Sequence, residues 1–179
     1  ELNLDMLVGG HRTPVLQHTP LDHLTPVAAQ QRYLQYAQEQ LVLACGQLPA
    51  ASQSLYTLAR VYTLMDRAKV ETPMLCLPSA IALHQAALVV DPRNSQAANE
   101  LGVLLASCGR LEEARQVLLH SVTLRPEPAA WRNLSVVHQR LGEPELARRA
   151  SAQAATVDTQ TGSRPAGAPV QSVQWVDPE

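Results

Sequence analysis

Three histidines near the amino terminus have side chains that could bind a metal ion, because imidazole nitrogens are common zinc ligands. His11, His18 and His23 are separated by seven and five residues along the chain. These separations match no familiar pattern of zinc ligands. We therefore expect no metal site in this segment.

Residues for other kinds of chemistry are equally scattered. The three cysteines, Cys45, Cys76 and Cys108, form no Cys-x-x-Cys pair. A free cysteine behaves as a small hydrophobic residue, and we expect Cys45 and Cys108 to be buried in helices. The sequence contains no Gly-x-Gly-x-x-Gly, phosphate-binding loop, His-Glu-x-x-His or Gly-x-Ser-x-Gly motif. No nucleophile has a base at a recognisable spacing, so we expect no catalysis and no cofactor.

The composition argues against two classes of partner. The net charge is -2 and the pI about 6.3, so a general affinity for nucleic acid or for an anionic membrane is not expected. No apolar run approaches the roughly 20 residues needed to span a bilayer, so we expect no membrane insertion. Hydrophobic residues make up 46% of the chain but aromatic residues only 3%. A core of Ala, Leu and Val favours closely packed helices over a β-sandwich.

An internal repeat determines where binding residues would lie. The stretch ANELGVLLASCGRLEEA, residues 98–114, recurs as WRNLSVVHQRLGEPELA, residues 131–147, at an offset of 33 residues. A fixed period of this length is typical of proteins built from stacked repeats. Apolar and small residues recur at helical spacing on both sides of Gly109 and Gly142. Glycine readily ends a helix in a left-handed conformation, so each unit is predicted to be a helix–turn–helix hairpin.

The repeat resembles that of the tetratricopeptide repeat (TPR) family, whose period is about 34 residues. The residues that carry the resemblance are Ala98, Leu101, Gly102, Leu105, Ala114, Leu118, Ser121 and Pro126 in one unit, and Trp131, Leu134, Ser135, His138, Ala147, Ser151 and Ala154 in the next. The resemblance implies an all-α fold, a right-handed superhelical stack of antiparallel helix hairpins (a TPR-like α-solenoid). His138 occupies the family's aromatic core position, which indicates a packed histidine.

The expected domain organisation has three parts. Residues 1–26 form an extended arm that contains prolines, residues 27–160 the repeat domain, and residues 161–179 a linker and extended tail. Within the domain, an irregular unit at about 52–94 precedes the clear units 95–127 and 128–160. Extra residues around 67–78 predict a long loop or an extended helix in the irregular unit. Thr25 and Pro26 are suited to begin the first helix.

In TPR proteins the first helix of each unit lines the concave face of the stack. Carried over position by position, the resemblance predicts a peptide-binding groove lined by Gln53, Tyr56, Arg60, Asn99, Val103, Ser107, Arg132, Val136, Gln139 and Arg140. These positions include three arginines and no carboxylate. Arginine binds carboxylates through two parallel hydrogen bonds, and side-chain amides pair with peptide backbone. We therefore expect a protein or peptide partner with an acidic bias.

Two functional hypotheses follow from these observations. The first is a non-catalytic protein–protein interaction module that binds a partner segment in the concave groove. The alternative is a structural or assembly segment of a larger protein, with the groove filled by its own arm or tail or by a symmetric copy. The chain begins with Glu1, which suggests a truncated amino terminus. The compartment is therefore left open: the cytoplasm is slightly favoured, and an exported or periplasmic location is the alternative.

Overall fold

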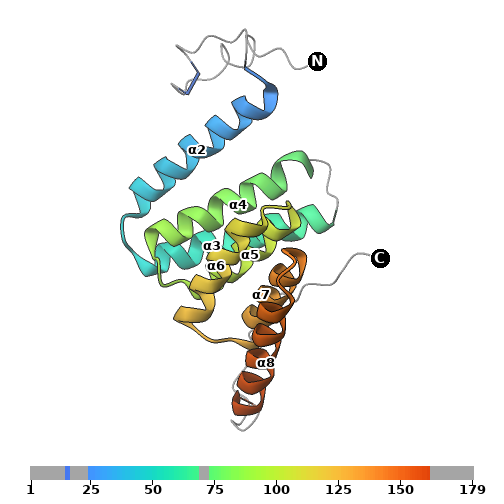
Figure 1. Ribbon diagram of the computed structural model, residues 1–179. Helices are drawn as coiled ribbons and strands as arrows, with labels where there is room; N and C mark the ends of the chain where they lie inside the picture. The colour runs from blue at the N-terminus through green and yellow to red at the C-terminus, as the bar shows by residue number, and fades with distance from the viewer. Residues whose placement is uncertain (1–14, 17–23, 69–72, 162–179) are drawn as a thin grey trace.

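The computed structural model describes residues 15–16, 24–68 and 73–161 (Figure 1). In these ranges there are seven helices and no strand: α2 (Pro26–Cys45), α3 (Pro49–Arg67), α4 (Pro73–Val90), α5 (Ser95–Ser107), α6 (Leu111–Leu124), α7 (Pro128–Arg140) and α8 (Pro144–Thr161). None of these helices combines the length and the hydrophobicity that crossing a bilayer requires. The expected extended arm and tail lie outside the described residues, apart from residues 15–16 and 24–26 of the arm and residue 161 at the end of α8.

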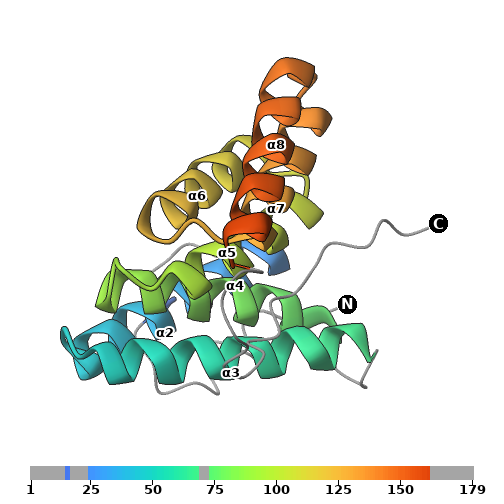
Figure 2. The same cartoon turned by 90° about the horizontal axis from the view of Figure 1, so that it is seen from below.

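Three antiparallel hairpins, α3–α4, α5–α6 and α7–α8, stack one on the next (Figure 1; Figure 2). The second helix of each hairpin packs against the first helix of the next, so α4 contacts α5 and α6 contacts α7. The first helices α5 and α7 also contact each other. This is the all-α solenoid that the repeat predicts.

The two predicted glycine turns have the same backbone geometry. Gly109 has a φ of 77° and Gly142 a φ of 76°. The Arg110 amide donates to the Leu105 carbonyl at 3.0 Å, and the Glu143 amide donates to the His138 carbonyl at 2.9 Å. These hydrogen bonds satisfy backbone carbonyls that would be unpaired at the end of the helix. A positive φ is strained for residues with a Cβ atom, which explains why glycine occupies both positions. The prediction of hairpins divided at glycine is confirmed.

The core forms two clusters. In the carboxyl-terminal cluster, Leu118 of α6 is fully buried among side chains of α5 and α7. Gly102 of α5 lies so near this side chain that a Cβ atom at position 102 would be 2.5 Å from the Leu118 Cγ atom. The glycine therefore sets the separation of the two helices. The second cluster joins α3, α4 and the start of α5, and includes Leu55, Ala59 and Val90.

Helix α2 begins at the predicted residues, and its two halves pack differently on the rest of the molecule. The Thr25 hydroxyl oxygen accepts a hydrogen bond from the Ala28 amide at 3.2 Å, and Pro26 is the first helical residue. α2 lies mainly on α4, and only its carboxyl-terminal half, with Leu41 and Val42, packs against the amino-terminal core cluster. Figure 1 shows this half of α2 meeting the α3–α4 hairpin while the other half diverges from it.

The structure differs from the sequence-based expectation at the cysteines but not at the irregular unit. The extra residues of the irregular unit lengthen its helices, since α3 continues to Arg67 and α4 begins at Pro73. The expected burial of Cys45 and Cys108 is wrong: Cys45 is half-buried and Cys108 is exposed, whereas Cys76 is buried. Cys108 follows the last residue of α5, and there the chain turns away from the core.

Candidate functional site

The expected lining residues lie on α3, α5 and α7, the first helices of the three hairpins. Their exposure differs widely. Gln53, Ser107, Gln139 and Arg140 are exposed, Arg60, Arg132 and Val136 are half-buried, and Tyr56, Asn99 and Val103 are buried. Binding through this face would therefore involve chiefly the first two groups.

On α3, an aromatic cluster lies beneath the face. Tyr56 is 6% exposed, and its ring centroid lies 5.7 Å from that of His84 on α4. The Arg60 guanidinium carbon lies 5.9 Å from the Tyr56 ring centroid. Burial raises the pKa of the Tyr56 hydroxyl, the charge of Glu100 adds to this effect, and Arg60 opposes it. Tyr56 is thus a neutral packing residue rather than an exposed contact.

Between α5 and α7, two asparagines join the repeats. The Asn133 side-chain amide donates to the Asn99 side-chain oxygen at 3.0 Å, and both residues are buried. Beside them, Val103 and Val136 line a hollow of only about 10 Å³. No side chain fits a space of that size, which is comparable with a single water molecule. Asn133 was not among the expected lining residues, although it follows Asn99 by one repeat period.

Two of the arginines already have partners within the chain. Arg132 of α7 forms an ion pair with Asp158 of α8. Arg140 donates from Nη1 to the Ala106 carbonyl at 2.7 Å, which connects α7 to α5. The ten positions themselves contain no carboxylate, yet the fold brings Asp158 to Arg132. The structure therefore offers no support for a strongly cationic groove.

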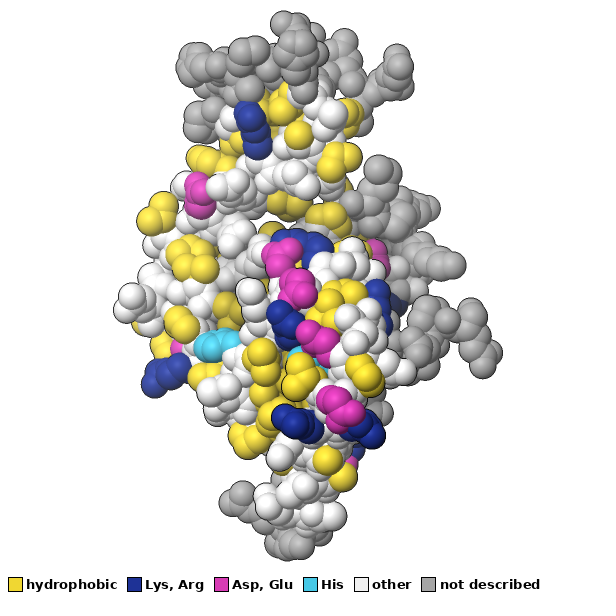
Figure 3. Space-filling model, viewed as in Figure 1, with side chains coloured by type: hydrophobic (Ala, Val, Ile, Leu, Met, Phe, Trp, Pro, Cys, Tyr) yellow, Lys and Arg dark blue, Asp and Glu magenta, His cyan; other side chains and the backbone are white. Residues whose placement is uncertain are grey.

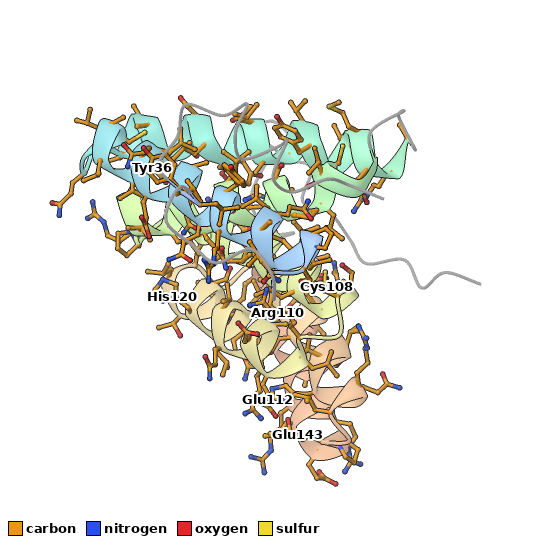
Figure 4. All side chains as sticks on the ribbon, turned by 90° about the horizontal axis from the view of Figure 1, so that it is seen from above. Tyr36, Cys108, Arg110, Glu112, His120 and Glu143 are labelled. Atoms are coloured by element: carbon orange, nitrogen blue, oxygen red, sulfur yellow. The ribbon has the colours of Figure 1, made fainter. Side chains whose placement is uncertain are left out.

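A second hollow lies between the amino-terminal half of α2 and α4. It has a volume of about 700 Å³, an apolar floor that includes Leu34 and Ile81, and glutamines along its sides. Cys108 and Arg110 of the α5–α6 turn lie at its edge, beside the start of α2 in Figure 4. No pattern in the sequence predicts this hollow, because it results from the angle at which α2 crosses α4.

A network of charged side chains connects the last two repeats on another face. The guanidinium of Arg115 on α6 contacts Glu112 at 2.5 Å and Glu143 at 2.8 Å. Glu143 also contacts the Nδ1 atom of the buried His138 at 2.6 Å. Figure 4 shows Glu112 and Glu143 near each other, and in Figure 3 basic and acidic side chains alternate along this face. The packed position expected for His138 is confirmed.

This network leads to a prediction about stability. Replacing Glu143 by alanine should lower the free energy of unfolding by about 1–2 kcal/mol, because both Arg115 and the buried imidazole lose a partner. Replacing Glu145, whose pair with Arg148 is exposed, should change it by less than about 0.5 kcal/mol. Urea titration followed by circular dichroism would measure both. Equal effects of the two substitutions would show that the network does not stabilise the contact between repeats.

Within the described parts of the chain, no group of three or more His, Cys, Asp or Glu side chains is arranged to hold a metal ion. His11, His18 and His23 lie outside the described residues.

Comparisons with known proteins concern the repeats and the fold. No protein-family model matches the chain. Over 71 residues it is 39% identical to TPR repeat-containing thioredoxin TTL4 of Arabidopsis thaliana. The aligned stretch is 39% of this chain and 10% of that protein, so the chain spans about a tenth of the length of this curated relative.

Solved structures of MamA share the architecture. A crystal structure of MamA superposes with a TM-score of 0.56 at 17% identity, covering 84% of this chain and 86% of MamA. The structure of a MamA mutant superposes with a TM-score of 0.51 at 18% identity, covering 85% and 86% of the two chains. At these identities the likeness concerns the fold alone.

Proposed function

We propose that this chain, which is a tetratricopeptide repeat protein in its repeat motif and its helical fold, is a non-catalytic module that binds a segment of another protein across the face formed by α3, α5 and α7. Folds of this kind serve in general as protein-interaction scaffolds. The single observation that supports this particular face is the Arg132–Asp158 ion pair, in which both side chains are partly exposed, at 42% and 47%.

In an ion pair that is this exposed, one charged group is easily replaced by another of the same sign. Such pairs contribute only about 0–1 kcal/mol to stability, since water competes for both charges. A carboxylate of the partner could therefore replace Asp158 at Arg132 at little cost to the fold. Around Arg132, the internal hydrogen bonds of Asn133 and Arg140 hold α5 and α7 in a fixed relative position. A surface that is ordered before binding loses little conformational entropy on binding.

Two substitutions with opposite expected effects test this proposal. Arg132→Glu should weaken binding of acidic peptides about tenfold or more, because an attraction becomes a repulsion. Asp158→Asn should strengthen it several-fold, because the internal competitor loses its charge. An array of fifteen-residue synthetic peptides with varied charge, probed with fluorescently labelled full chain, would measure both effects.

Arg148→Glu is the matched control, because Arg148 is an exposed arginine of α8 that pairs with Glu145. It changes the net charge of the chain as Arg132→Glu does, but away from the proposed face. Circular dichroism would establish that the variants fold. Identical peptide profiles for the Arg132, Asp158 and Arg148 variants would contradict binding at Arg132.

A further inference from the structure

The outward face of α3 carries a regular series of uncharged residues. They follow one another at alternating intervals of four and three residues, the spacing by which a helix pairs with another helix in a coiled coil. The series is Ala50, Ser54, Thr57, Val61, Leu64 and Ala68, and all six residues are exposed. Ala68 directly follows the last helical residue. We refer to these six residues as the α3 series.

The polar members of the α3 series direct their hydroxyl groups into the helix. The Ser54 hydroxyl donates to the Ala50 carbonyl at 3.0 Å, and the Thr57 hydroxyl donates to the Gln53 carbonyl at 2.9 Å. The larger members face solvent, with Val61 47% and Leu64 57% exposed. The face therefore presents methyl groups and a leucine side chain to water, which is unfavourable for an unpaired surface.

None of the described helices covers this face. The opposite side of α3, with Leu55 and Ala59, packs into the core. In Figure 2 and Figure 4, α3 is the outermost helix along one edge of the molecule. α2 lies mainly on α4 and leaves the α3 series exposed.

We propose that the α3 series is a self-association surface on which α3 of a second copy packs in the antiparallel direction. The series is symmetric about residue 59, so an antiparallel partner brings Ala50 opposite Ala68, Ser54 opposite Leu64, and Thr57 opposite Val61. In the Ser54–Leu64 and Thr57–Val61 layers a small side chain thus meets a larger one, which allows close helix packing, and the two outer layers pair alanine with alanine. A parallel partner would place leucine opposite leucine and serine opposite serine.

The residues that flank the α3 series are compatible with this arrangement. Leu58, which is 45% exposed, lies on the flank that faces α2, where it lines a hollow together with Leu34 and Leu41, and its exposed part would lie near the two-fold axis. Arg60 lies on the other flank, but its guanidinium leans over the Tyr56 ring, toward the buried side of the helix. The repulsion between the two Arg60 side chains is reduced accordingly.

The opposite end of the stack favours a two-fold dimer over a filament. The exposed surface of α8 carries Glu145, Arg148, Arg149 and Asp158. The α3 series is uncharged, so covering these side chains with it would remove their charges from water and would supply no charged group of its own in return. A head-to-tail contact is therefore disfavoured, whereas an α3–α3 contact closes on itself.

The contact is expected to be reversible. Helix α3 has 19 residues and is therefore about 28 Å long, so a single pair of such helices buries less than a standard protein interface. Sedimentation equilibrium of the full chain from about 10 µM to about 1 mM should show a monomer–dimer equilibrium in this range. Absence of association up to the highest concentration would overturn the proposal.

The surface and the direction of packing can each be tested by substitution. Val61→Glu should weaken dimerisation about 100-fold, since each carboxylate would be buried opposite Thr57, whose hydroxyl already donates to the Gln53 carbonyl. Val89→Glu is the matched control, because Val89 is an exposed valine of α4 outside the α3 series, and it should leave dimerisation within about twofold. Equal effects of the two substitutions would overturn the proposal, and circular dichroism would check that both variants are helical.

Thr57→Lys alone should also yield monomers. Mixing Thr57→Lys with Val61→Glu should restore a heterodimer, because only the antiparallel direction places residue 57 opposite residue 61. Sedimentation of the mixture with one fluorescently labelled component would detect it. Failure of the mixture to associate would overturn the antiparallel arrangement. Association through the arm or the tail would leave both single variants dimeric, and would also overturn it.

Discussion

Replacing Leu118 by alanine should lower the free energy of unfolding by about 2–5 kcal/mol, the largest effect that we expect from any single substitution. Leu118 is 0% exposed and belongs to the cluster that joins α5, α6 and α7. Truncation removes buried methyl groups and leaves a cavity that the surrounding helices can only partly fill. Urea unfolding followed by circular dichroism would measure the loss.

Leu118→Ala should also reverse the sign of the stability change that Gly102→Ala causes. In the native chain, Gly102→Ala places a Cβ atom 2.5 Å from the Leu118 Cγ atom. The resulting overpacking costs about 1–3 kcal/mol and outweighs the gain of about 1 kcal/mol from the higher helix propensity of alanine. With alanine at 118 the obstructing atoms are gone, so Gly102→Ala should become stabilising.

A double-mutant cycle would measure the coupling between these two positions. Leu119→Ala is the control for the cycle, because Leu119 is the next residue of the same helix and is 42% exposed. It should cost less than about 1 kcal/mol and should leave the effect of Gly102→Ala unchanged. If Gly102→Ala had the same sign in both backgrounds, contact with Leu118 would not be the reason for the glycine.

The second large effect is a dependence of stability on pH that comes from His84. This side chain is 0% exposed, and both of its ring nitrogens lack a hydrogen-bond partner among the described residues. Burial lowers the pKa of its imidazole to about 4, with a smaller contribution from the positive charge of Arg60. In the unfolded chain the pKa returns to about 6.5.

The sign of the effect follows from proton uptake. Between about pH 6.5 and pH 4 the unfolded chain binds a proton at His84 that the folded chain does not. The stability is therefore fully present above about pH 6.5 and decreases as the pH falls. By pH 4 the loss should reach about 3 kcal/mol. Unfolding free energies from urea titrations across this pH range would measure it.

Phenylalanine at position 84 should remove this dependence. His84→Phe places an aromatic ring without polar nitrogens at the site, and should also raise the stability at pH 7 by about 1–3 kcal/mol. The exposed His120 provides the control, and His120→Gln should leave the acid-induced loss unchanged. A loss of the same size in the native chain and in His84→Phe would show that other groups cause the acid sensitivity.

The sequence alone was sufficient to predict the helices, their turns and the stacking of the hairpins. These features depend on interactions within one repeat or between neighbouring repeats, and their signals recur at a fixed period. Gly109 and Gly142 illustrate this point, because the turn geometry that each requires is decided by residues within the same turn. The site was only partly predictable, since the ten expected lining residues lie on the expected helices but differ in exposure.

The tertiary structure alone determined which side chains that are distant in the sequence contact each other. Asp158 forms an ion pair with Arg132 because α8 returns alongside α7. The Asn133 side chain donates a hydrogen bond to Asn99 because consecutive repeats stack in register. The crossing of α2 over α4 opens a hollow and leaves one face of α3 without a covering helix among the described residues. Local spacing identifies which residues share a face of a helix. Whether another helix covers that face depends on packing between elements, and only the tertiary structure determines it.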